Sequence, residues 1–418
     1  MRSILAIPFL TLALAACGSA SDRPVDLAIG PKPPLPEPHK TLFPTVNVAQ
    51  AVGWPAGMMP TPAPGLKVNE FAGGFQHPRW LYVLPNGDIL VAETDNPGTD
   101  HTGGTIKGKI QGMLMKKAGS SQGSANRISL LRDADGDGVA ETKTLLVSGL
   151  YSPLGMAFAN GELFVANANG VVAFPFQPGQ TAITAKPRVV TALPSGYNHH
   201  WTKSLLASPD GKYLFVGVGS NSNVGENGLE MEKGRAAVWM IDAKTGAYRI
   251  FASGIRNPVG IAWNPWSKQL WVSVNERDEI GSDLVPDYMT SVRDGGFYGW
   301  PYSYYGQHVD ARVQPPRPDL VAKAIVPDYA LGPHTASLGF TFYDGTLLPK
   351  PYRGGAFVGQ HGSWNRKPPS GYKVIFVPFA GGMPSGEARD VLTGFLDGDG
   401  HAQGRPVGVA VDTRGALL

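Results

Sequence analysis

Arg256 and Asn257 stand in a tight turn at residues 254–258 that leads directly into the apolar run Val259–Trp263. Gly and Pro punctuate such turns, so the polar pair is held at a fixed point while the next strand anchors it in a core. Arginine is always charged and carries forked donors, which suit an anionic or oxyanionic target. A loop arginine paired with a carboxylate is an equally good interpretation of this turn taken alone.

Two adjacent histidines, His199 and His200, precede another apolar run at residues 205–208. The unperturbed pKa of histidine is about 6.5, so a positioned histidine is a natural general base. Other interpretations stay open, because a loop histidine is often structural and two adjacent histidines can also bind a metal.

These polar groups belong to a frame that recurs along the chain: a Pro-containing turn, a short apolar strand, an Asn/Asp-Gly turn and a second apolar strand. The six copies begin at Pro78, Pro153, Leu205, Pro258, Leu338 and Pro406. Two-strand units with little helical periodicity between them predict an all-β fold, a six-bladed β-propeller. A β-sandwich would not require the shared Pro-x-Gly turn. The last copy stops at Leu418, so we expect the last blade to be truncated at the C-terminus, with an unpaired edge.

In a propeller, the loops that lead into the strands converge at one mouth of the central channel. On the repeat alignment, His200 precedes the third copy, Arg256 and Asn257 precede the fourth, Arg366 follows the fifth, and Arg405 precedes the sixth. Equivalent positions should face the same axis. Converging arginines predict an anionic ligand there.

The composition narrows the class of protein. The chain has 418 residues, of which 42% are hydrophobic and 17% are charged, which is ample for a large core. Its Gly (54) and Pro (37) residues fall between short apolar runs, as expected for many strands joined by turns. A net charge of +3 without a basic cluster argues against nucleic acid as a partner. The single cysteine excludes an intramolecular disulfide and a haem-attachment motif.

The N-terminus resembles a bacterial export signal. A charged start is followed by a short apolar run and by Cys17, the only cysteine. Leu14-Ala15-Ala16-Cys17 resembles a lipobox, whose cysteine becomes lipidated; an ordinary secretory signal with a fortuitous cysteine is the alternative. Gly18, rather than an aspartate, favours the outer membrane over the inner membrane by this resemblance.

We therefore expect a lipoprotein signal peptide at residues 1–16, a Pro-rich tether at 17–63 and a propeller at 64–418. The tether would lift the propeller off the membrane. The protein would be anchored in the bacterial cell envelope by lipid alone and would face the periplasm.

Seven short motifs together resemble the quinoprotein glucose/sorbosone dehydrogenase family, six-bladed propellers that depend on pyrroloquinoline quinone (PQQ). The resemblance covers residues 65–418, and within the family the chain is most similar to the sorbosone-dehydrogenase-like branch. The motifs are Asn198–Thr202, Ser208–Gly211, Gly219–Asn223, Gly254–Pro258, Gly295–Pro301, His361–Arg366 and Gly404–Pro406.

Carried over residue by residue, the resemblance implies that His200 is the catalytic base and that Arg256 steadies negative charge on the quinone. Cofactor contacts would come from Asn257, Arg366 and Arg405. An active-site calcium ion, Ca²⁺, would be held by the backbone carbonyls of Glu276 and Arg277.

The activity implied is oxidation of an aldose or a sugar-derived, sorbosone-like aldehyde, with hydride passing to PQQ. Since the chain has no haem motif, electrons would leave to a separate acceptor, a quinone or a cytochrome. The chain departs from the family's pattern at His199, where the sugar enzymes carry an aspartate, and at residues 150–152, where a glutamine contact is expected. These departures leave the substrate open.

Two other functions also stay open. A non-catalytic propeller lipoprotein would keep the frame for ligand binding or as a scaffold. A propeller lactonase would hold a metal with side-chain carboxylates on the axis, whereas the candidates here are arginines and a histidine.

A separate acidic loop at residues 133–138 resembles the first half of an EF-hand. Asp133, Asp135 and Asp137 alternate as oxygen ligands for calcium do, and Gly138 stands at the sixth position of the loop. The twelfth position is Thr144 rather than glutamate, so a complete EF-hand is excluded, and Glu141 could supply a ligand instead. We expect a structural calcium loop away from the chemistry; a solvated acidic turn is the alternative.

Overall fold

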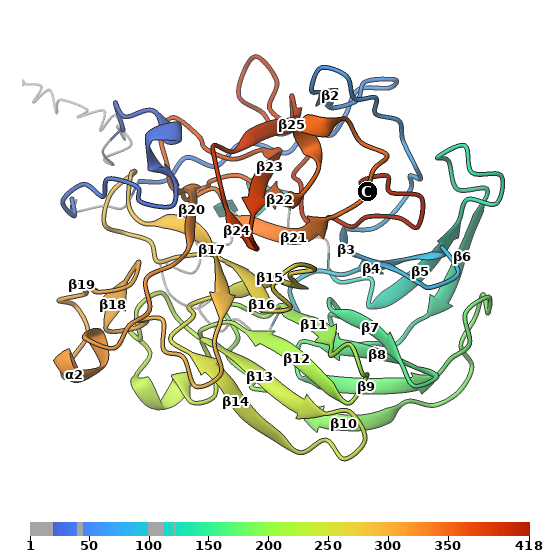
Figure 1. Cartoon of the computed structure of the whole chain (residues 1–418), viewed down its shortest axis with the longest axis horizontal. Coiled ribbons are helices and arrows are strands. Elements are labelled where there is room, and N and C mark those ends of the chain that lie inside the picture. Colours follow the sequence, from blue (N-terminus) through green and yellow to red (C-terminus); the bar gives the residue numbers. More distant parts are fainter. Residues whose placement is uncertain (1–19, 40–44, 99–112, 115, 120–122) are drawn as a thin grey trace, which may run out of the picture.

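The computed structural model describes residues 20–39, 45–98, 113–114, 116–119 and 123–418. Five antiparallel sheets of four to six strands are arranged around a common centre (Figure 1). The fold is a β-propeller, which confirms the all-β prediction. Short helical turns lie in the connections: η1 (Val25–Ala28), η3 (Leu229–Glu232), α2 (Pro318–Val321) and η4 (Lys350–Tyr352).

Three sheets contain four strands in consecutive order. The first holds β3 (Pro78–Val83), β4 (Ile89–Glu93), β5 (Arg127–Arg132) and β6 (Thr142–Val147). The second holds β7 (Met156–Ala159), β8 (Glu162–Asn167), β9 (Gly170–Pro175) and β10 (Arg188–Ala192). The third holds β11 (Lys203–Ala207), β12 (Tyr213–Val218), β13 (Ala237–Asp242) and β14 (Tyr248–Ser253).

The other two large sheets each add a short N-terminal strand at the outer edge. One runs β15 (Pro258–Trp263), β16 (Leu270–Val274), β17 (Pro286–Val292), β20 (Tyr329–Pro333) and β1 (Ile29–Gly30). The other runs β21 (Ser337–Tyr343), β22 (Gly355–Gln360), β23 (Lys373–Ala380), β25 (Arg389–Thr393) and β2 (Thr61–Pro62), with β24 (Met383–Pro384) on β23. A small hairpin joins β18 (Ser303–Tyr304) and β19 (His308–Val309).

The first strands of successive sheets line the centre, where β3, β7, β11, β15 and β21 contact one another in that order. Residues 405–418 lie between β21 and β3. The Gly339 amide donates to the Val407 carbonyl at 2.8 Å, and Val411 pairs with Leu417 as an isolated antiparallel bridge. Residues 405–418 thus form a short hairpin rather than a four-stranded sheet. Neither the count of six blades nor the truncated last blade is confirmed.

The glycine of the Pro-x-Gly frame has a steric cause. A Cβ on Gly260 would lie 2.5 Å from the Phe340 Cβ on β21, and a Cβ on Gly408 would lie 3.1 Å from the Arg79 carbonyl oxygen on β3. Real Cβ atoms tolerate neither contact without movement of a neighbour. The repeat needs glycine because neighbouring inner strands approach closely at this point.

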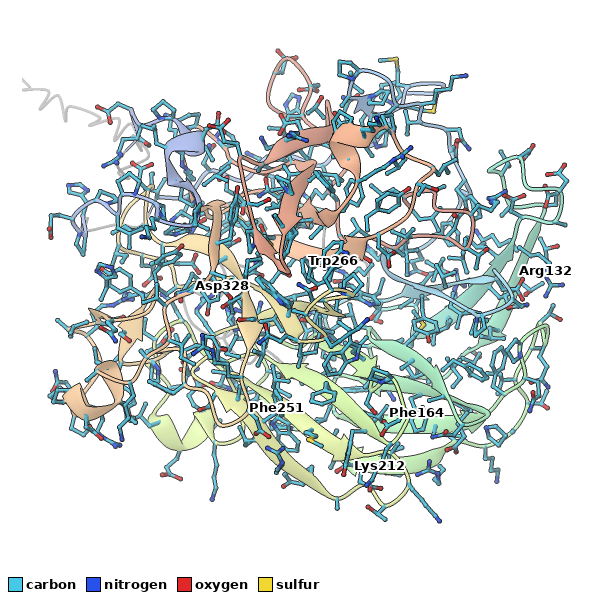
Figure 2. The ribbon with its side chains drawn as sticks, viewed as in Figure 1. Arg132, Phe164, Lys212, Phe251, Trp266 and Asp328 are labelled. Carbon is cyan, nitrogen blue, oxygen red and sulfur yellow. The ribbon has the colours of Figure 1, made fainter. Side chains whose placement is uncertain are left out.

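The core lies between the sheets. Strands β4, β16, β17 and β22 are buried along their whole length, because sheets cover both of their faces. Figure 2 shows Phe164 on β8 inside this packing, whereas Arg132 and Lys212 lie at the periphery. Burying a side chain as large as that of phenylalanine stabilises a fold by about 1.5–3 kcal/mol.

The described part of residues 17–63 differs from the predicted free tether. Ile29 and Gly30 pair with β20, Thr61 and Pro62 pair with β25, and the Ser21 amide donates to the Lys367 carbonyl at 2.7 Å. A Pro-rich composition fits both a free tether and a segment that packs on a surface. These contacts show that the described residues 20–39 and 45–63 include segments that pack on the propeller, and we call this part of the chain the N-terminal strap. Cys17 and the predicted signal peptide lie outside the described residues. No helix within the described residues is long and apolar enough to cross a membrane.

Candidate active site

His200 lies in the loop that leads into β11 and is half-buried. Its Nδ1 is 2.9 Å from the Ser220 carbonyl oxygen and 3.0 Å from the Ser220 hydroxyl oxygen, and that hydroxyl donates to the Ser222 carbonyl at 2.6 Å. Since a carbonyl only accepts, Nδ1 carries the proton and Nε2 keeps its lone pair. The structure therefore presents Nε2 as the basic atom.

The electrostatic surroundings keep the His200 imidazole neutral. Burial lowers its pKa well below the ordinary value, and the positive charge of Arg256 and the nearby His199 ring lower it further. The His199 and His200 rings meet edge to face with centroids 4.8 Å apart. A neutral imidazole with a free Nε2 can take a proton from a hydroxyl group.

Lys203 and Gly219 hold this loop in place. The buried Lys203 Nζ donates to the carbonyls of His200 and Trp201 at 3.3 and 3.0 Å. A Cβ on Gly219 would lie 2.5 Å from the His200 Cβ and 2.4 Å from the Asn257 side-chain oxygen. Glycine at 219 thus lets His200 and Asn257 lie side by side.

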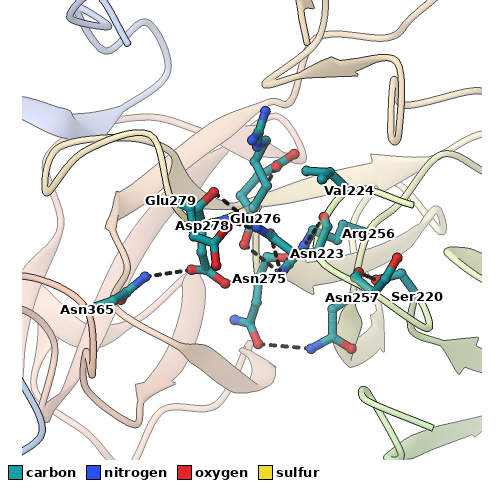
Figure 3. A network of polar contacts seen from close by, with 12 residues as sticks. Ser220, Asn223, Val224, Arg256, Asn257, Asn275, Glu276, Asp278, Glu279 and Asn365 are labelled. Atoms are coloured by element: carbon teal, nitrogen blue, oxygen red, sulfur yellow. Dashed lines mark hydrogen bonds and ion pairs between the residues drawn. The ribbon is translucent and has the colours of Figure 1, made fainter. Parts of the chain in front are cut away.

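Arg256 is buried at the centre of a polar network formed by two loops (Figure 3). Its Nε donates to the Asn223 carbonyl at 3.2 Å, and its Nη2 donates to Asn223 Oδ1 and Asp278 Oδ2 at 3.0 and 3.1 Å. Its Nη1 donates to the carbonyls of Asn275 and Glu276 at 3.2 and 2.6 Å. A guanidinium has five N–H groups, so every donor of Arg256 has a protein partner.

Three carboxyl groups of this region, Asp278, Glu276 and Asp287, have differently shifted pKa values. Burial alone would raise the pKa of Asp278, but Arg256 and then His334 outweigh it, so the pKa lies well below the ordinary value. Burial raises the pKa of Glu276 to about 8 and that of Asp287 to about 6. Asp278 is therefore the ionised partner of Arg256, and Glu276 is mainly protonated at neutral pH.

His334 completes the network beneath Asp278. Its Nδ1 lies 3.4 Å from Asp278 Oδ1, and Asn365 donates to the same carboxylate oxygen at 2.7 Å. Burial opposes the charged imidazole, but the hydrogen bond to Asp278 outweighs it and raises the pKa of His334. The three side chains hold the loop after β16 against the loop after β22.

The predicted calcium ligands do not form a free site. The Glu276 carbonyl accepts the Arg256 guanidinium at 2.6 Å, as does the Asn275 carbonyl beside it at 3.2 Å. The Arg277 side chain is buried, pairs with Asp310 and lies over the Tyr304 ring at 5.7 Å. A calcium ion at the Glu276 carbonyl would meet the Arg256 guanidinium already in place, so this carbonyl as arranged does not fit the predicted ion. The Arg277 carbonyl stays a prediction.

A second group of basic residues at this mouth has unused donors. Arg405 donates from Nη1 to the Tyr372 hydroxyl at 2.9 Å and from Nη2 to the Ala49 carbonyl at 3.0 Å. Arg79, at the start of β3, lies 3.7 Å from Asp95. The Nε atoms of Arg79 and Arg405 are both buried with no hydrogen-bond partner among the described residues.

His361 lies close to both of these arginines. Burial lowers its pKa well below the ordinary value, and the charges of Arg405 and then Arg79 lower it further. Arg79 also stacks over Trp201, with its guanidinium carbon 5.6 Å from the ring. We call Arg79, His361 and Arg405 the basic group. Its unpartnered N–H donors and excess positive charge fit an anionic ligand.

Asn257 lies between His200 and the Arg256 network. Its amide donates to Asn275 Oδ1 at 3.2 Å, while its own Oδ1 is buried without a partner among the described residues. The predicted cofactor contact thus has an acceptor available. Polar atoms of this kind are rarely left unsatisfied in the interior.

Arg366 is fully buried and serves the N-terminal strap. Its Nη2 donates to the Arg23 carbonyl and to Asp283 Oδ1, both at 3.0 Å, and its own carbonyl accepts Asn47 at 2.9 Å. Its Nη1 donates to the Pro368 carbonyl at 2.8 Å. The predicted cofactor contact at Arg366 stays a prediction: three of its five donors bind other parts of the fold, and its Nε is buried without a partner among the described residues.

The acidic loop joins β5 to β6, at the end of the first sheet opposite the mouth. One oxygen each from Asp133, Asp135, Asp137 and Glu141 lies within 4.8 Å of the others. The two oxygens of Asp133 accept the amides of Gly136 and Gly138, and Arg414 pairs with the same carboxylate. The spacing suits a cation, and the predicted calcium loop stays a prediction.

His200, Arg256, Asn257 and Arg405 were found in sequence motifs, and the structure places all of them at one mouth of the propeller. Sequence analysis missed Arg79, although the first copy of the frame contains it immediately after Pro78. It also missed Ser220 and Asn223, which lie in a motif that was noticed but given no role. Their position in the loop that follows the third copy of the frame could have indicated that they lie at this mouth.

Comparison with known proteins agrees with this geometry. A model of the TrAA12-like family matches residues 60–287 and 321–418. The pyrroloquinoline quinone-dependent pyranose dehydrogenase of Coprinopsis cinerea is 24% identical over 367 residues, which cover 76% of this chain and 44% of that enzyme. The match therefore spans less than half of the fungal enzyme's length.

Two solved structures share the fold. The holo form of the PQQ domain of pyranose dehydrogenase from C. cinerea has a TM-score of 0.66 at 20% identity and covers 92% of this chain and 95% of that chain. The calcium structure of a Trichoderma reesei protein of carbohydrate-active enzymes family AA12 has a TM-score of 0.67 at 19% identity and covers 86% and 93%. The predicted resemblance to quinoprotein sugar dehydrogenases is confirmed, and this chain belongs to the TrAA12-like family.

Proposed function

We propose that this protein is a PQQ-dependent oxidoreductase that acts on an aldose or a sugar-derived aldehyde. The observation that carries the proposal is the pairing, at one mouth, of a neutral histidine with a free Nε2 and a basic group with unpartnered buried donors. The first feature suits proton abstraction from a hydroxyl group. The second suits an anionic cofactor.

The residues present fit PQQ, which carries three carboxylate groups. Arg79 and Arg405 would hold its carboxylates through the donors that lack partners, and Asn257 would supply the polar contact between them and His200. When bound, PQQ supplies a quinone that accepts two electrons from the substrate.

His200 does the proton chemistry in this proposal. Its Nδ1–H is fixed on the Ser220 carbonyl, so Nε2 would accept the proton of the substrate hydroxyl. Arg256 contributes its charge, which keeps the imidazole neutral, but its donors are already committed. This differs from the role of direct donor to the quinone that the resemblance implies for Arg256.

The lactonase alternative is not favoured. A metal held by axial carboxylates needs carboxylate oxygens that are free to coordinate. At this mouth Asp278 pairs with Arg256 and His334, and Asp287 accepts the amides of Glu276 and Ser337 at 3.1 and 2.9 Å.

The proposal is tested by adding PQQ to the purified protein and measuring dye reduction with a panel of aldoses and aldehydes, including sorbosone-like dicarbonyls. We expect PQQ-dependent turnover in the wild type, loss of turnover in His200→Gln, and normal turnover in His308→Gln, an exposed histidine on β19. PQQ binding without turnover on any substrate would favour the non-catalytic alternative. Absence of PQQ binding would overturn the proposal.

We also propose the cellular location and the separate electron acceptor that the sequence predicts. Lipidation of Cys17 would anchor the protein in the outer membrane with the propeller facing the periplasm, and a separate quinone or cytochrome would reoxidise the cofactor. Incorporation of labelled palmitate, lost in Cys17→Ser, tests the anchor. A wild-type protein that stays unlabelled in a bacterial host would contradict it.

The position of residues 405–418 supports a further part of the fold prediction. We propose that this hairpin holds the sixth blade position, because it lies between β21 and β3 and carries Arg405 at the same mouth as the other strand-leading loops. Replacing Gly408 with valine should then disturb packing on β3 and lower the melting temperature.

A further inference from the structure

The shell around the Arg256 side chain has the chemistry of a cation site. Its five acceptors are all oxygens: the backbone carbonyls of Asn223, Asn275 and Glu276, the Asn223 side-chain oxygen and one Asp278 oxygen. Protein calcium sites use the same oxygen types, carbonyl, amide and carboxylate. Here the distances are those of hydrogen bonds to a guanidinium.

The two loops that supply these oxygens are about fifty residues apart in the sequence and meet around Arg256. Residue 223 belongs to the loop after β12, and residues 275–278 belong to the loop after β16. Figure 3 shows Arg256 between Asn223 and the Asn275–Asp278 segment. Asn223 also links the loops directly, because its Oδ1 accepts the Asp278 amide at 2.9 Å and its carbonyl accepts Trp300 Nε1 at 2.9 Å.

The charge of the shell is already balanced. Asp278 is the one carboxylate among the five contacts, and its oxygen pairs with the guanidinium at 3.1 Å. A divalent ion at the Asn275 and Glu276 carbonyls would place two more positive charges beside a buried arginine. Such repulsion is strong where water does not screen it.

We propose that the Arg256 guanidinium is the resident cation of this site and takes the place of a calcium ion at the carbonyls of Asn275 and Glu276. The inference rests on the proposed function in that it concerns the metal expected beside the cofactor. It predicts that the mouth is organised without calcium and that cofactor binding does not require the ion.

Terbium luminescence tests the inference at this site, because Trp300 contacts the shell and can sensitise a bound lanthanide. Two other groups that could hold a cation are first disabled, so that ions bound there do not contribute: the acidic loop by Asp135→Asn and Asp137→Asn, and the group of Asp397, Asp399 and His401 by Asp397→Asn and Asp399→Asn. In this background we expect no terbium luminescence that depends on Trp300. Trp300→Phe should therefore leave any remaining signal unchanged. A saturable, Trp300-dependent signal displaced by calcium would overturn the inference.

Melting temperature gives a second readout that does not depend on activity. In the same background, the wild-type Arg256 protein should melt at the same temperature in chelator and in excess calcium. Arg256→Met should melt several degrees lower in chelator, and Arg256→Lys should rescue only part of that loss because an ammonium cannot reach five fixed acceptors. Calcium-dependent melting of the protein with Arg256 intact would contradict the inference.

PQQ binding in chelator separates this inference from the proposed function. If the wild type binds PQQ with the same affinity in chelator and in calcium, both stand. If binding occurs only with calcium, the resident-cation inference fails while the proposed function stands. If PQQ binds under neither condition, the proposed function fails, and the terbium and melting measurements still decide the inference.

Discussion

Two groups of basic residues at one mouth of the propeller differ in how their donors are used. Arg256 directs all five of its N–H groups to oxygens of its own chain. Arg79 and Arg405 each keep a buried Nε without a partner among the described residues. Residue type and position at the mouth alone would have assigned both groups the same role.

The difference separates Arg256, whose donors all bind the scaffold, from Arg79 and Arg405, which keep a donor for a ligand. Arg277 and Arg366 also keep buried donors without partners among the described residues, but the first pairs with Asp310 and the second binds the N-terminal strap. A saturated guanidinium stabilises the loops that it joins, and little of its bonding capacity remains for anything else. An unsaturated buried donor is costly in the free protein, at about 1–3 kcal/mol, and a ligand that accepts from it recovers that cost. Binding and stability measurements should therefore separate the two groups.

The largest expected effect is on stability, from Arg256→Met. Removing one partner of a buried ion pair typically costs about 3–5 kcal/mol, and here the loops after β12 and β16 would lose their common partner. Chemical denaturation measures the loss. Arg249→Met is the matched control, because Arg249 pairs with Asp294 on the exposed surface. That control should cost less than about 1 kcal/mol. Equal losses in the two variants would break the comparison.

The next effect is on turnover, from His200→Gln. Losing a positioned base lowers kcat by about 10²–10⁴-fold, whereas the melting temperature should change little. Steady-state kinetics with saturating PQQ gives the ratio of kcat values. Wild-type turnover in a folded His200→Gln protein would remove His200 from the chemistry.

A smaller effect is expected on cofactor affinity, from Arg405→Met and Arg79→Met. Hydrogen bonds to charged groups contribute about 1.5–3 kcal/mol, so each variant should bind PQQ about 10- to 100-fold more weakly. Stability should fall less than in Arg256→Met, because Arg79 and Arg405 make fewer contacts with the fold than Arg256 does. Fluorescence titration measures the affinity; a variant that unfolds instead of losing affinity would place that arginine with the scaffold.

The smallest effect concerns pH. Burial and the charge of Arg256 lower the pKa of His200, so the imidazole stays neutral as the pH falls through its ordinary pKa of about 6.5. Protonation at the lower, shifted pKa then removes the base. The acid limb of kcat/KM should therefore lie below pH 6.5. An acid limb above that value would show that the Arg256 charge does not act on His200 as described.

Much of the fold could be predicted because its signal is local. The Pro-x-Gly frame marks the inner strands, and structure explains its glycine by the close approach of β15 to β21 and of residue 408 to β3. The strap could not be predicted in this way. Residues 29–30 and 61–62 pair with strands some 300 residues later in the chain, and their Pro-rich surroundings carry no sign of those partners.

The sequence predicted where the residues of the candidate site lie, but not which of them stabilise the loops and which keep donors for a ligand. The turn at 254–258 placed Arg256 and Asn257 correctly, because the strand that follows fixes them. All Arg256 donors have partners because Asn223 lies beside residues 275–278 in the fold. The sequence gives no sign that these two segments meet. Arg79 was overlooked because a single arginine after Pro78 gains meaning only beside Arg405 and His361.

The central claim is that the basic group binds an anionic quinone while Arg256 belongs to the scaffold. Titration of PQQ in chelator, followed by tryptophan fluorescence, tests it directly in the wild type, in Arg256→Lys and in the Arg79→Met, Arg405→Met double variant. We predict saturable binding of one PQQ to the wild type and loss of that binding in the double variant, which should still fold. Unchanged affinity in a folded double variant, or no saturable binding to the wild type, would contradict the claim.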